Sequence, residues 1–253
     1  MIEIPARDDD PNLAMLELVV NALGDLCESL VFLGGCATSL LVTVQRAKQI
    51  RVTEDVDVVA KAATIHEYHA VEAQLRARGF KQDGSPGAPI CRWVGAGTTL
   101  DVMPSEPGIL SFDNRWYSLA VKTAQDVRLP SGRIIKLVTA PVFIATKIDA
   151  MRDRSAGDYL SSHDLEDIVT VVDGRPSLSD EMSSVPAELR AYIKKQLGSL
   201  LSSSSFMDAL QGHLPGDAAS QARLPELIRR LRSLAGAGAS RSREASYSWL
   251  RGN

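Results

Sequence analysis

Strand-forming runs occur only before about residue 139, and helical spacing dominates the chain after it. Short apolar or alternating runs predict strands over 30–35, 55–60, 98–104 and 127–138, the last as a hairpin. Helical spacing predicts helices between them, over 10–30, 38–49 and 64–80. Because strands and helices alternate, this half is α/β or α+β.

The second half reads as helical. APVFIATKIDAMRDR (140–154), SSHDLEDIVTVVDG (161–174) and VPAELRAYIKKQLGSLL (185–201) each combine a start signal with helical spacing. A loose connection is expected at 202–205. We therefore expect a sheet-bearing domain over 1–139, a helical domain over 140–235 and a flexible tail over 236–253.

Charge and cysteine usage exclude several classes of protein. The formal net charge of the 253 residues is -3, so no overall positive field indicates a nucleic-acid binder. The longest uncharged stretch, 29–45, is too short to span a bilayer, and the acidic, proline-broken start does not resemble a targeting peptide. We expect a cytoplasmic protein without membrane contact, whose three cysteines, Cys27, Cys36 and Cys91, are reduced and mostly buried.

Three aspartates predict a metal site. Asp55 and Asp57 are separated by one residue of a predicted strand, so they share a face with Cα atoms about 6 to 7 Å apart. An adjacent strand would bring Asp101 beside them. Three clustered carboxylates repel one another unless a cation neutralises them, and hard oxygen ligands favour Mg²⁺ or Mn²⁺. Since magnesium often binds substrate phosphates as well, a nucleotide substrate is favoured.

A pair of glycines predicts the place of the phosphates. Gly34 and Gly35 follow a predicted strand and precede a predicted helix, where phosphate oxygens can approach backbone N–H groups. Thr38 and Ser39 would add hydroxyl donors there. Taken singly, Gly-Gly is more often a plain turn, and Asp-x-Asp is more often a solvated strand face.

The order of these signals narrows the interpretation. FLGGCATSL (32–40), RVTEDVDVV (51–59) and LDVMP (100–104) together resemble the nucleotidyltransferase fold of the polymerase-beta-like superfamily. The stretch 145–175 is similar to nucleotidyltransferases of the AbiEii type, which are toxins of type IV toxin–antitoxin systems. The resemblance covers about residues 25–175. It implies an α+β fold in which a mixed sheet flanked by helices precedes a helical domain.

The resemblance also implies residue roles. Gly34 and Gly35 match the nucleotide-binding turn, Asp55 and Asp57 the metal-binding pair, and Asp101 the third acid. Lys147 matches a lysine that touches the nucleotide, and Asp164 opens the Asp-x-x-Asp element, in which we expect Asp167 to be structural. Arg51 and Thr53 fit the stretch before the metal pair. Many relatives carry a basic residue where this chain has His163.

The implied activity is transfer of a nucleoside monophosphate from a nucleoside triphosphate to an acceptor. The resemblance implies RNA as acceptor, particularly the 3′ end of tRNA, with a toxin role and a cognate antitoxin as partner. Two alternatives stay open: an antibiotic-modifying, aminoglycoside-type nucleotidyltransferase, and a non-catalytic nucleotide-binding module.

The remaining candidate groups are assigned structural or surface roles. His66, His69 and His163 lack the spacing or partners of a metalloprotease or a nucleophilic site. The helical half contains a cluster of basic residues, namely Lys194, Lys195, Arg229, Arg230 and Arg232. We interpret it in the first place as a solvated helix face, and in the second place as a surface that binds an RNA backbone.

Overall fold

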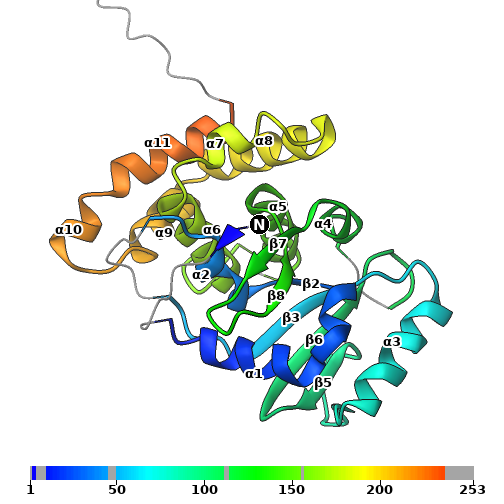
Figure 1. Ribbon diagram of the computed structural model, residues 1–253. Helices are drawn as coiled ribbons and strands as arrows, with labels where there is room; N and C mark the ends of the chain where they lie inside the picture. Colours follow the sequence, from blue (N-terminus) through cyan, green and yellow to red (C-terminus); the bar gives the residue numbers. More distant parts are fainter. Residues whose placement is uncertain (1, 4–9, 45–49, 111–113, 155–156, 237–253) are drawn as a thin grey trace, which may run out of the picture.

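The computed structural model describes residues 2–3, 10–44, 50–110, 114–154 and 157–236, and shows a mixed sheet packed among helices (Figure 1). Within these residues, eight strands form one sheet in the order β1-β7-β8-β2-β3-β6-β5-β4. The strands are β1 (Ile2–Glu3), β2 (Leu30–Leu33), β3 (Asp55–Ala60), β4 (Lys81–Gln82), β5 (Arg92–Gly95), β6 (Thr98–Pro104), β7 (Gln125–Arg128) and β8 (Ile134–Leu137). The α+β prediction is confirmed.

Parallel and antiparallel pairs alternate across the centre of the sheet. β3 runs antiparallel to β2 and parallel to β6, and β6 is antiparallel to β5. On the other side, β2 is parallel to β8, which forms the predicted antiparallel hairpin with β7. β4 and β5 were not predicted from the sequence. The predicted strands that begin at 30, 55 and 98 are all present.

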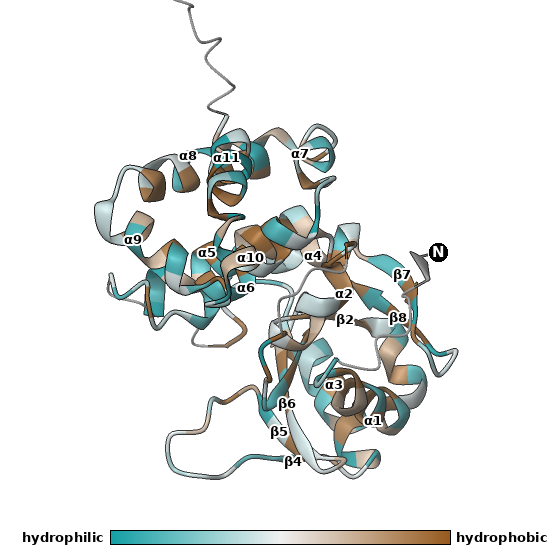
Figure 2. Ribbon diagram, turned by 90° about the vertical axis from the view of Figure 1, so that its left-hand side faces the viewer, coloured by the Kyte–Doolittle hydropathy of each residue, from teal (hydrophilic) through white to brown (hydrophobic). Residues whose placement is uncertain are grey.

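Helices of the first half join and cover the strands. They are α1 (Leu13–Leu23), η1 (Gly24–Ser29, a 3₁₀ helix), η2 (Gly35–Ala37, also 3₁₀), α2 (Thr38–Leu41), α3 (Ile65–Ala77) and α4 (Tyr117–Thr123). Figure 2 shows α1 and α3 on the same side of β5 and β6, and Arg78 Nε, directly after α3, donates a hydrogen bond to the carbonyl of Leu23 at the end of α1. Thr64 and Glu67 form a capping box at the start of α3, which fixes where that helix begins.

Two helices are shorter than predicted. The helix expected over 10–30 begins at Leu13 and gives way to η1 at Gly24, whose positive φ of 54° ends the α-helical path. The Asp10 carboxylate accepts a hydrogen bond from the Asn12 N–H just before this helix begins. The helix expected over 38–49 ends at Leu41, since Val42 is extended; residues 45–49 lie outside the described part of the chain.

From Ala140 onwards the described chain is helical, as predicted. The helices are α5 (Ala140–Arg154), α6 (His163–Gly174), α7 (Leu178–Glu181), α8 (Ala187–Leu201), α9 (Ser204–Gly212), α10 (Ala218–Gln221) and α11 (Leu224–Leu234). The loose connection expected at 202–205 is only two residues long, because the Ser203 hydroxyl caps α9 by accepting from the Phe206 N–H. The tail expected over 236–253 lies, beyond Gly236, outside the described residues.

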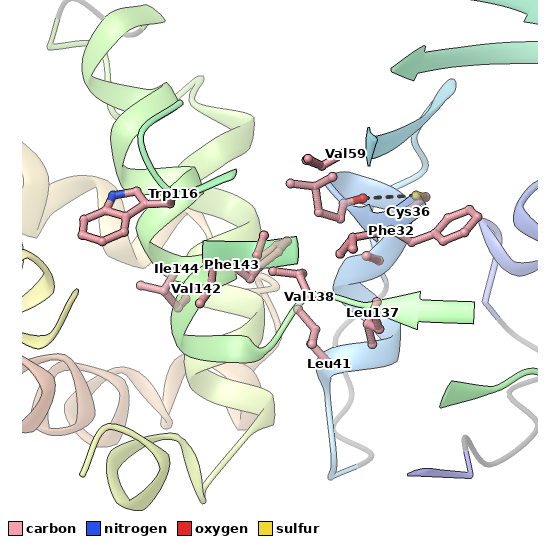
Figure 3. Close-up of a cluster of buried hydrophobic side chains, with 14 of the residues drawn as sticks. Phe32, Cys36, Leu41, Val59, Trp116, Leu137, Val138, Val142, Phe143 and Ile144 are labelled. Carbon is pink, nitrogen blue, oxygen red and sulfur yellow. Dashed lines mark hydrogen bonds between the residues drawn. The ribbon is translucent and has the colours of Figure 1, made fainter. Parts of the chain in front are cut away.

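One hydrophobic core runs through both halves. Figure 3 shows Phe32 and Leu137 of the sheet near Val142 and Phe143 of α5, and all belong to a single cluster of buried residues. Cys27, Cys36 and Cys91 are free and buried, as predicted. The division into domains at residue 139 stays a prediction. Among the described residues, no helix is both long and apolar enough to cross a membrane.

Candidate active site

Three aspartates lie on one face at the centre of the sheet. In the parallel pairing of β3 with β6, Asp57 is the direct partner of Asp101. Asp55 precedes Asp57 by two residues on β3 and therefore points to the same face. We call Asp55, Asp57 and Asp101 the acid row. Strand register alone thus brings together side chains that are more than 40 positions apart in the sequence.

A glycine turn lies against the middle of the acid row. Leu33, the last residue of β2, is paired with Asp57, and Gly34 follows with φ of 74°. A Cβ atom on Gly34 would collide with the Asp57 carboxylate. A Cβ atom on Gly35 would lie 2.8 Å from the Arg51 guanidinium and 3.1 Å from Thr53 Oγ1. Gly34 therefore needs glycine both because of close approach and because of its backbone conformation, whereas a side chain at Gly35 would require the end of Arg51 to move.

Asp57 carries the charge that is least compensated. Burial of its carboxyl group raises the pKa of Asp57 to about 7. The negative charge of Asp55 also raises this pKa, and its effect is larger than the opposite effect of Lys147. In the described part of the chain, no ion pair or hydrogen bond reaches this carboxylate. A cation placed beside Asp57 would relieve this cost.

The other two members of the acid row share an arginine. Arg92 on β5 is the antiparallel partner of Asp101. Its Nε donates to Asp101 Oδ1 at 2.8 Å and its Nη2 to Oδ2 at 2.8 Å, while Nη2 also donates to Asp55 Oδ2 at 3.3 Å. These hydrogen bonds to Asp101 hold the pKa of Arg92 above its ordinary value.

Sequence reasoning missed Arg92 because it missed β5. The sequence does contain a signal for this strand, because Gly95-Ala96-Gly97 directly precedes TTLDVMP and is typical of a hairpin turn. In a hairpin where Gly95 pairs with Thr98, the residue three positions before Gly95, Arg92, pairs with the residue three positions after Thr98, Asp101.

The donor set fits a divalent metal in part. Asp55 and Asp57 offer adjacent hard oxygens, and Asp57 has no partner of its own. Both oxygens of Asp101 are engaged by Arg92. No group of three His, Cys, Asp or Glu side chains is arranged as a metal site within the described residues. The placement of the acid row agrees with the prediction, but metal ligation by Asp101 does not fit the arrangement as it stands and stays a prediction.

Lys147 is buried between two helices and is fully paired. Its Nζ lies 2.7 Å from Asp167 Oδ2 and 3.2 Å from Asp164 Oδ1, both on α6. Burial alone would lower the pKa of Lys147, but the charges of Asp167 and Asp164 outweigh it and hold the pKa above its ordinary value. Lys147 is therefore a fixed positive charge.

Lys147 and Asp57 meet at a small cleft of about 60 Å³, whose lining does not include Asp55 or Asp101. Gly34, Asp57, Lys147 and Asp164 all line it, together with Arg154, which sequence reasoning also missed. The Arg154 side chain is 75% exposed and lies 3.6 Å from Asp164 Oδ2. Arg154 and Asp164 also line a second cavity of about 290 Å³, which is bounded by the end of α5 and by the segment that leads into α6.

Two expected phosphate contacts do not reach this cleft. Thr38 and Ser39 are buried at 2% and 1% exposure. The Thr38 hydroxyl donates to the Gly34 carbonyl at 3.4 Å, so it supports the glycine turn from behind. The reason is that α2 turns inwards directly after the glycines and packs on α6. A role for either hydroxyl in nucleotide binding stays a prediction that this placement disfavours.

The stretch before β3 is tied to its surroundings. The Thr53 hydroxyl donates to Asp55 Oδ1 at 2.8 Å, and the Thr53 N–H donates to Asn12 Oδ1 at 2.9 Å. Arg51 Nη2 donates to Asp167 Oδ2 at 3.4 Å, which links this stretch to α6. These contacts orient Asp55 and join the acid row to the Lys147 pairs.

The other candidate groups lie at the surface or have partners. His66 and His69 are exposed, and the His163 side chain is 73% exposed. Within the basic cluster, Arg229 and Arg230 both bind Glu226, and Arg230 also donates to the carbonyl groups of Val172 and Asp173 at the end of α6. Those two arginines are engaged within the fold.

Comparison with known proteins finds similarity only among solved structures. The sequence matches no protein-family model and no curated protein. The solution structure of the antibiotic-resistance factor ANT(2'')-Ia is similar with a TM-score of 0.46 and 14% identity, over 76% of this chain and 96% of that one. The crystal structure of a proposed nucleotidyltransferase from H. pylori is similar with a TM-score of 0.42 and 11% identity, over 92% of this chain and 95% of that one. The AbiEii type and its toxin role stay predictions.

Proposed function

We propose that this protein transfers a nucleoside monophosphate from a nucleoside triphosphate to an acceptor hydroxyl. One observation carries the proposal: Asp57 lies directly beside Asp101 and is pressed against the Gly34 turn at a cleft that also contains Lys147. Such a transfer requires carboxylates that bind a metal ion, a backbone turn without side chains beside the phosphates, and a positive charge in a fixed position.

Asp55 and Asp57 would hold the metal, for which Mg²⁺ or Mn²⁺ is the proposed ion. When bound, such an ion neutralises negative charge on a triphosphate and polarises the phosphorus that is attacked. The raised pKa of Asp57 agrees with this assignment, since a buried carboxylate next to a second carboxylate is stabilised by a bound cation.

The chain's own groups position the triphosphate. The absence of a side chain at Gly34 leaves room for phosphate oxygens next to Asp57. Lys147 supplies a positive charge whose position is fixed by two carboxylates, and Arg154 supplies an exposed one at the edge of the cleft. Both charges offset the negative charge that develops on the leaving pyrophosphate.

In the proposed reaction, the acceptor oxygen forms a bond to the α-phosphorus while the bond from that phosphorus to the bridging oxygen of the β-phosphate breaks. The electron pair of the broken bond leaves with pyrophosphate. The proton of the acceptor hydroxyl passes to Asp101, which lies next to Asp57 on the neighbouring strand, and this step requires Arg92 to release one of the two Asp101 oxygens to which it donates.

We propose RNA as the acceptor, with the 3′ end of tRNA as the first candidate, and a toxin role; the sequence resemblance supports both. The antibiotic-modifying alternative needs an acidic pocket for a polycationic acceptor. A cavity of about 890 Å³ beside the start of α6 has one guanidinium, of Arg51, and one carboxylate, of Glu166, among its lining groups. It is therefore not an acidic pocket, but its balanced charge does not select RNA either, so the choice of acceptor rests on the sequence resemblance and on the assay below.

The test is transfer of label from α-labelled nucleoside triphosphates, with Mg²⁺ or Mn²⁺, to total tRNA or to aminoglycosides. We expect the wild-type chain to label tRNA, and Asp57→Ala to lose at least about 100-fold in rate, because a metal ligand is removed. Asp126→Ala is the matched control: it removes an exposed carboxylate on β7 that pairs with Lys136, away from the cleft.

The outcomes separate the three candidate functions. Undiminished transfer by a folded Asp57→Ala chain contradicts the assignment of the site. Labelling of aminoglycosides but not tRNA identifies the antibiotic-modifying alternative. Tight binding of nucleotide without release of pyrophosphate, whatever the acceptor, identifies the non-catalytic module.

A further inference from the structure

Arg92 occupies the position from which a cation would contact the outer members of the acid row. Its guanidinium makes two parallel hydrogen bonds of 2.8 Å to Asp101 and a third of 3.3 Å to Asp55. The Arg92 side chain is 27% exposed and that of Asp101 is 11% exposed, so solvent screens this pair only in part. Two-pronged arginine–carboxylate pairs are among the stronger ion pairs in proteins.

The backbone, and not a flexible side chain, decides that Arg92 faces the acids. Residues alternate between the two faces of a strand, and both neighbours of Arg92, Cys91 and Trp93, are buried on the opposite side. Arg76 of α3 lies over the Trp93 ring, with its guanidinium carbon 5.0 Å from the ring centroid. Because Trp93 is fixed on the opposite face of the sheet, the Arg92 side chain must lie on the face of the acid row.

The charge on this face is therefore partly neutralised before any ligand binds. Arg92 joins Asp55 to Asp101, whereas Asp57 forms no ion pair among the described residues, although Lys147 and Arg154 line the same cleft. A divalent ion bound by Asp55 and Asp57 would add positive charge next to the Arg92 guanidinium. The two cations would repel each other and would compete for the same oxygens of Asp55 and Asp101.

We propose that Arg92 is the resident counter-cation of the acid row and that a divalent metal ion must displace it from Asp101 to bind fully. This inference rests on the proposed function for the metal site, and it goes beyond that proposal by naming the residue that sets metal affinity. In the metal-free protein, Arg92 keeps Asp55 and Asp101 in place. Once displaced, its guanidinium is released at the edge of the site.

The test is the affinity for Mn²⁺ alone, measured by titration calorimetry and by the electron paramagnetic resonance signal of free Mn²⁺, without nucleotide. We expect Arg92→Gln to bind Mn²⁺ about tenfold more tightly than the wild-type chain, in the range usual for coupling between competing ligands. Arg92→Lys keeps the charge but not the two-pronged contact with Asp101, so we expect an intermediate affinity.

Two further variants separate competition from a general change in charge. Lys136→Gln removes one exposed positive charge on β8, whose partner is Asp126 on β7, and should leave Mn²⁺ affinity within about twofold, because exposed charges are well screened. Asp101→Asn combined with Arg92→Gln removes the ligand that Arg92 releases. We expect this double variant to lose the gain.

Equal Mn²⁺ affinity of the wild-type and Arg92→Lys chains, or weaker binding by a folded Arg92→Gln chain, would overturn the inference and would mean that the pair is permanent. Failure of every variant to bind Mn²⁺ would overturn it as well, together with the metal site. The transfer assay above reports on the proposed function independently, since it is read from labelled product and not from Mn²⁺ affinity. Circular dichroism checks that each variant is folded.

Discussion

Gly34 lacks the side chain that would otherwise collide with the central carboxylate of the acid row. Its φ of 74° also disfavours any residue with a Cβ atom. We predict that Gly34→Ala abolishes nucleotidyl transfer. It should also lower the free energy of unfolding by about 1 to 3 kcal/mol beyond the cost of placing alanine at a positive φ, because the added methyl group collides with the Asp57 side chain.

Gly79→Ala is the matched control for this prediction. Gly79 has a φ of 85°, but a Cβ atom there meets nothing within 4 Å. It therefore measures the cost of the positive φ without a collision, and transfer activity should be unchanged. Equal losses of stability in the two variants, measured by urea unfolding, would show that close approach to Asp57 does not matter.

Asp57 should destabilise the metal-free protein. Its pKa is raised from an ordinary value of 3.8 to about 7, chiefly by burial. A carboxyl group whose pKa is raised on folding favours the folded state below its unfolded pKa, and this contribution is lost as the pH rises through the folded pKa. The stability of the wild-type chain should therefore fall between about pH 4 and pH 7 because of this group.

We predict that Asp57→Asn, which keeps the shape of the side chain without the charge, raises the free energy of unfolding by about 1 to 2 kcal/mol at pH 8. The gain should shrink towards pH 5, where wild-type Asp57 is protonated. Thermal unfolding in the presence of a chelator, at both pH values, is the measurement. A variant less stable than wild type at pH 8 would contradict the electrostatic description of the acid row.

At the scale of elements, α5 and α6 are joined by the pairs that hold Lys147. Asp164 lines the cleft, whereas Asp167 lies behind Lys147 and also binds Arg51. We predict a division of effects: Asp167→Asn lowers the free energy of unfolding by about 1 to 3 kcal/mol, because it weakens two buried charge pairs. Asp164→Asn should have the smaller effect on stability and the larger effect on nucleotidyl transfer.

Parallel measurement of urea unfolding and of the rate of transfer tests this division. If Asp167→Asn lost transfer activity at undiminished stability, Asp167 and not Asp164 would be the site residue of α6. The expectation that Asp164 belongs to the site and Asp167 to the framework would then be wrong.

Most elements could be predicted from local patterns, and the failures have local physical causes. β3 and β6 were predictable because buried valine and leucine alternate with the aspartates, and α3 because Thr64 and Glu67 give a capping box. The 38–49 helix was overestimated because nothing in the local sequence shows that Thr43 and Val44 donate to the carbonyl of Gly174, far along the chain. That contact draws the backbone after α2 away from a helical path.

The candidate site likewise combines features that local sequence predicts with features that depend on contacts far along the chain. Spacing placed Asp55 and Asp57 on one face, and the expectation of a neighbouring strand placed Asp101 beside them. Arg92 and Arg154 were missed, because each acquires its meaning only from tertiary position: Arg92 from the register of a hairpin, and Arg154 from the approach of α5 to the acid row. The burial of Thr38 and Ser39 depends likewise on the packing of α2.

At the scale of the whole molecule, the site takes residues from both halves of the chain. The acid row comes from the sheet, whereas Lys147, Arg154 and Asp164 come from α5 and α6. The buried side chains of α5, including Phe143 and Ile148 at 0% exposure, complete the core beneath the sheet.

We predict that residues 1–139 expressed alone do not form a stable fold, because the apolar surface that α5 covers would be exposed to water. Amide chemical shifts in a two-dimensional NMR spectrum measure this directly: poor dispersion is expected for the fragment. A well-dispersed spectrum would show that the boundary at residue 139 separates independent domains.

In the proposed function, the acid row and the Gly34 turn together hold a nucleotide with its metal ion. The decisive measurement is the anomalous scattering of manganese from crystals soaked with Mn²⁺ and a nucleoside triphosphate whose α–β bridge resists cleavage. The predicted result is a manganese peak in contact with Asp55 and Asp57, with phosphate oxygens beside Gly34 and Lys147. A nucleotide bound elsewhere on the protein, with no manganese at these aspartates, would contradict the claim.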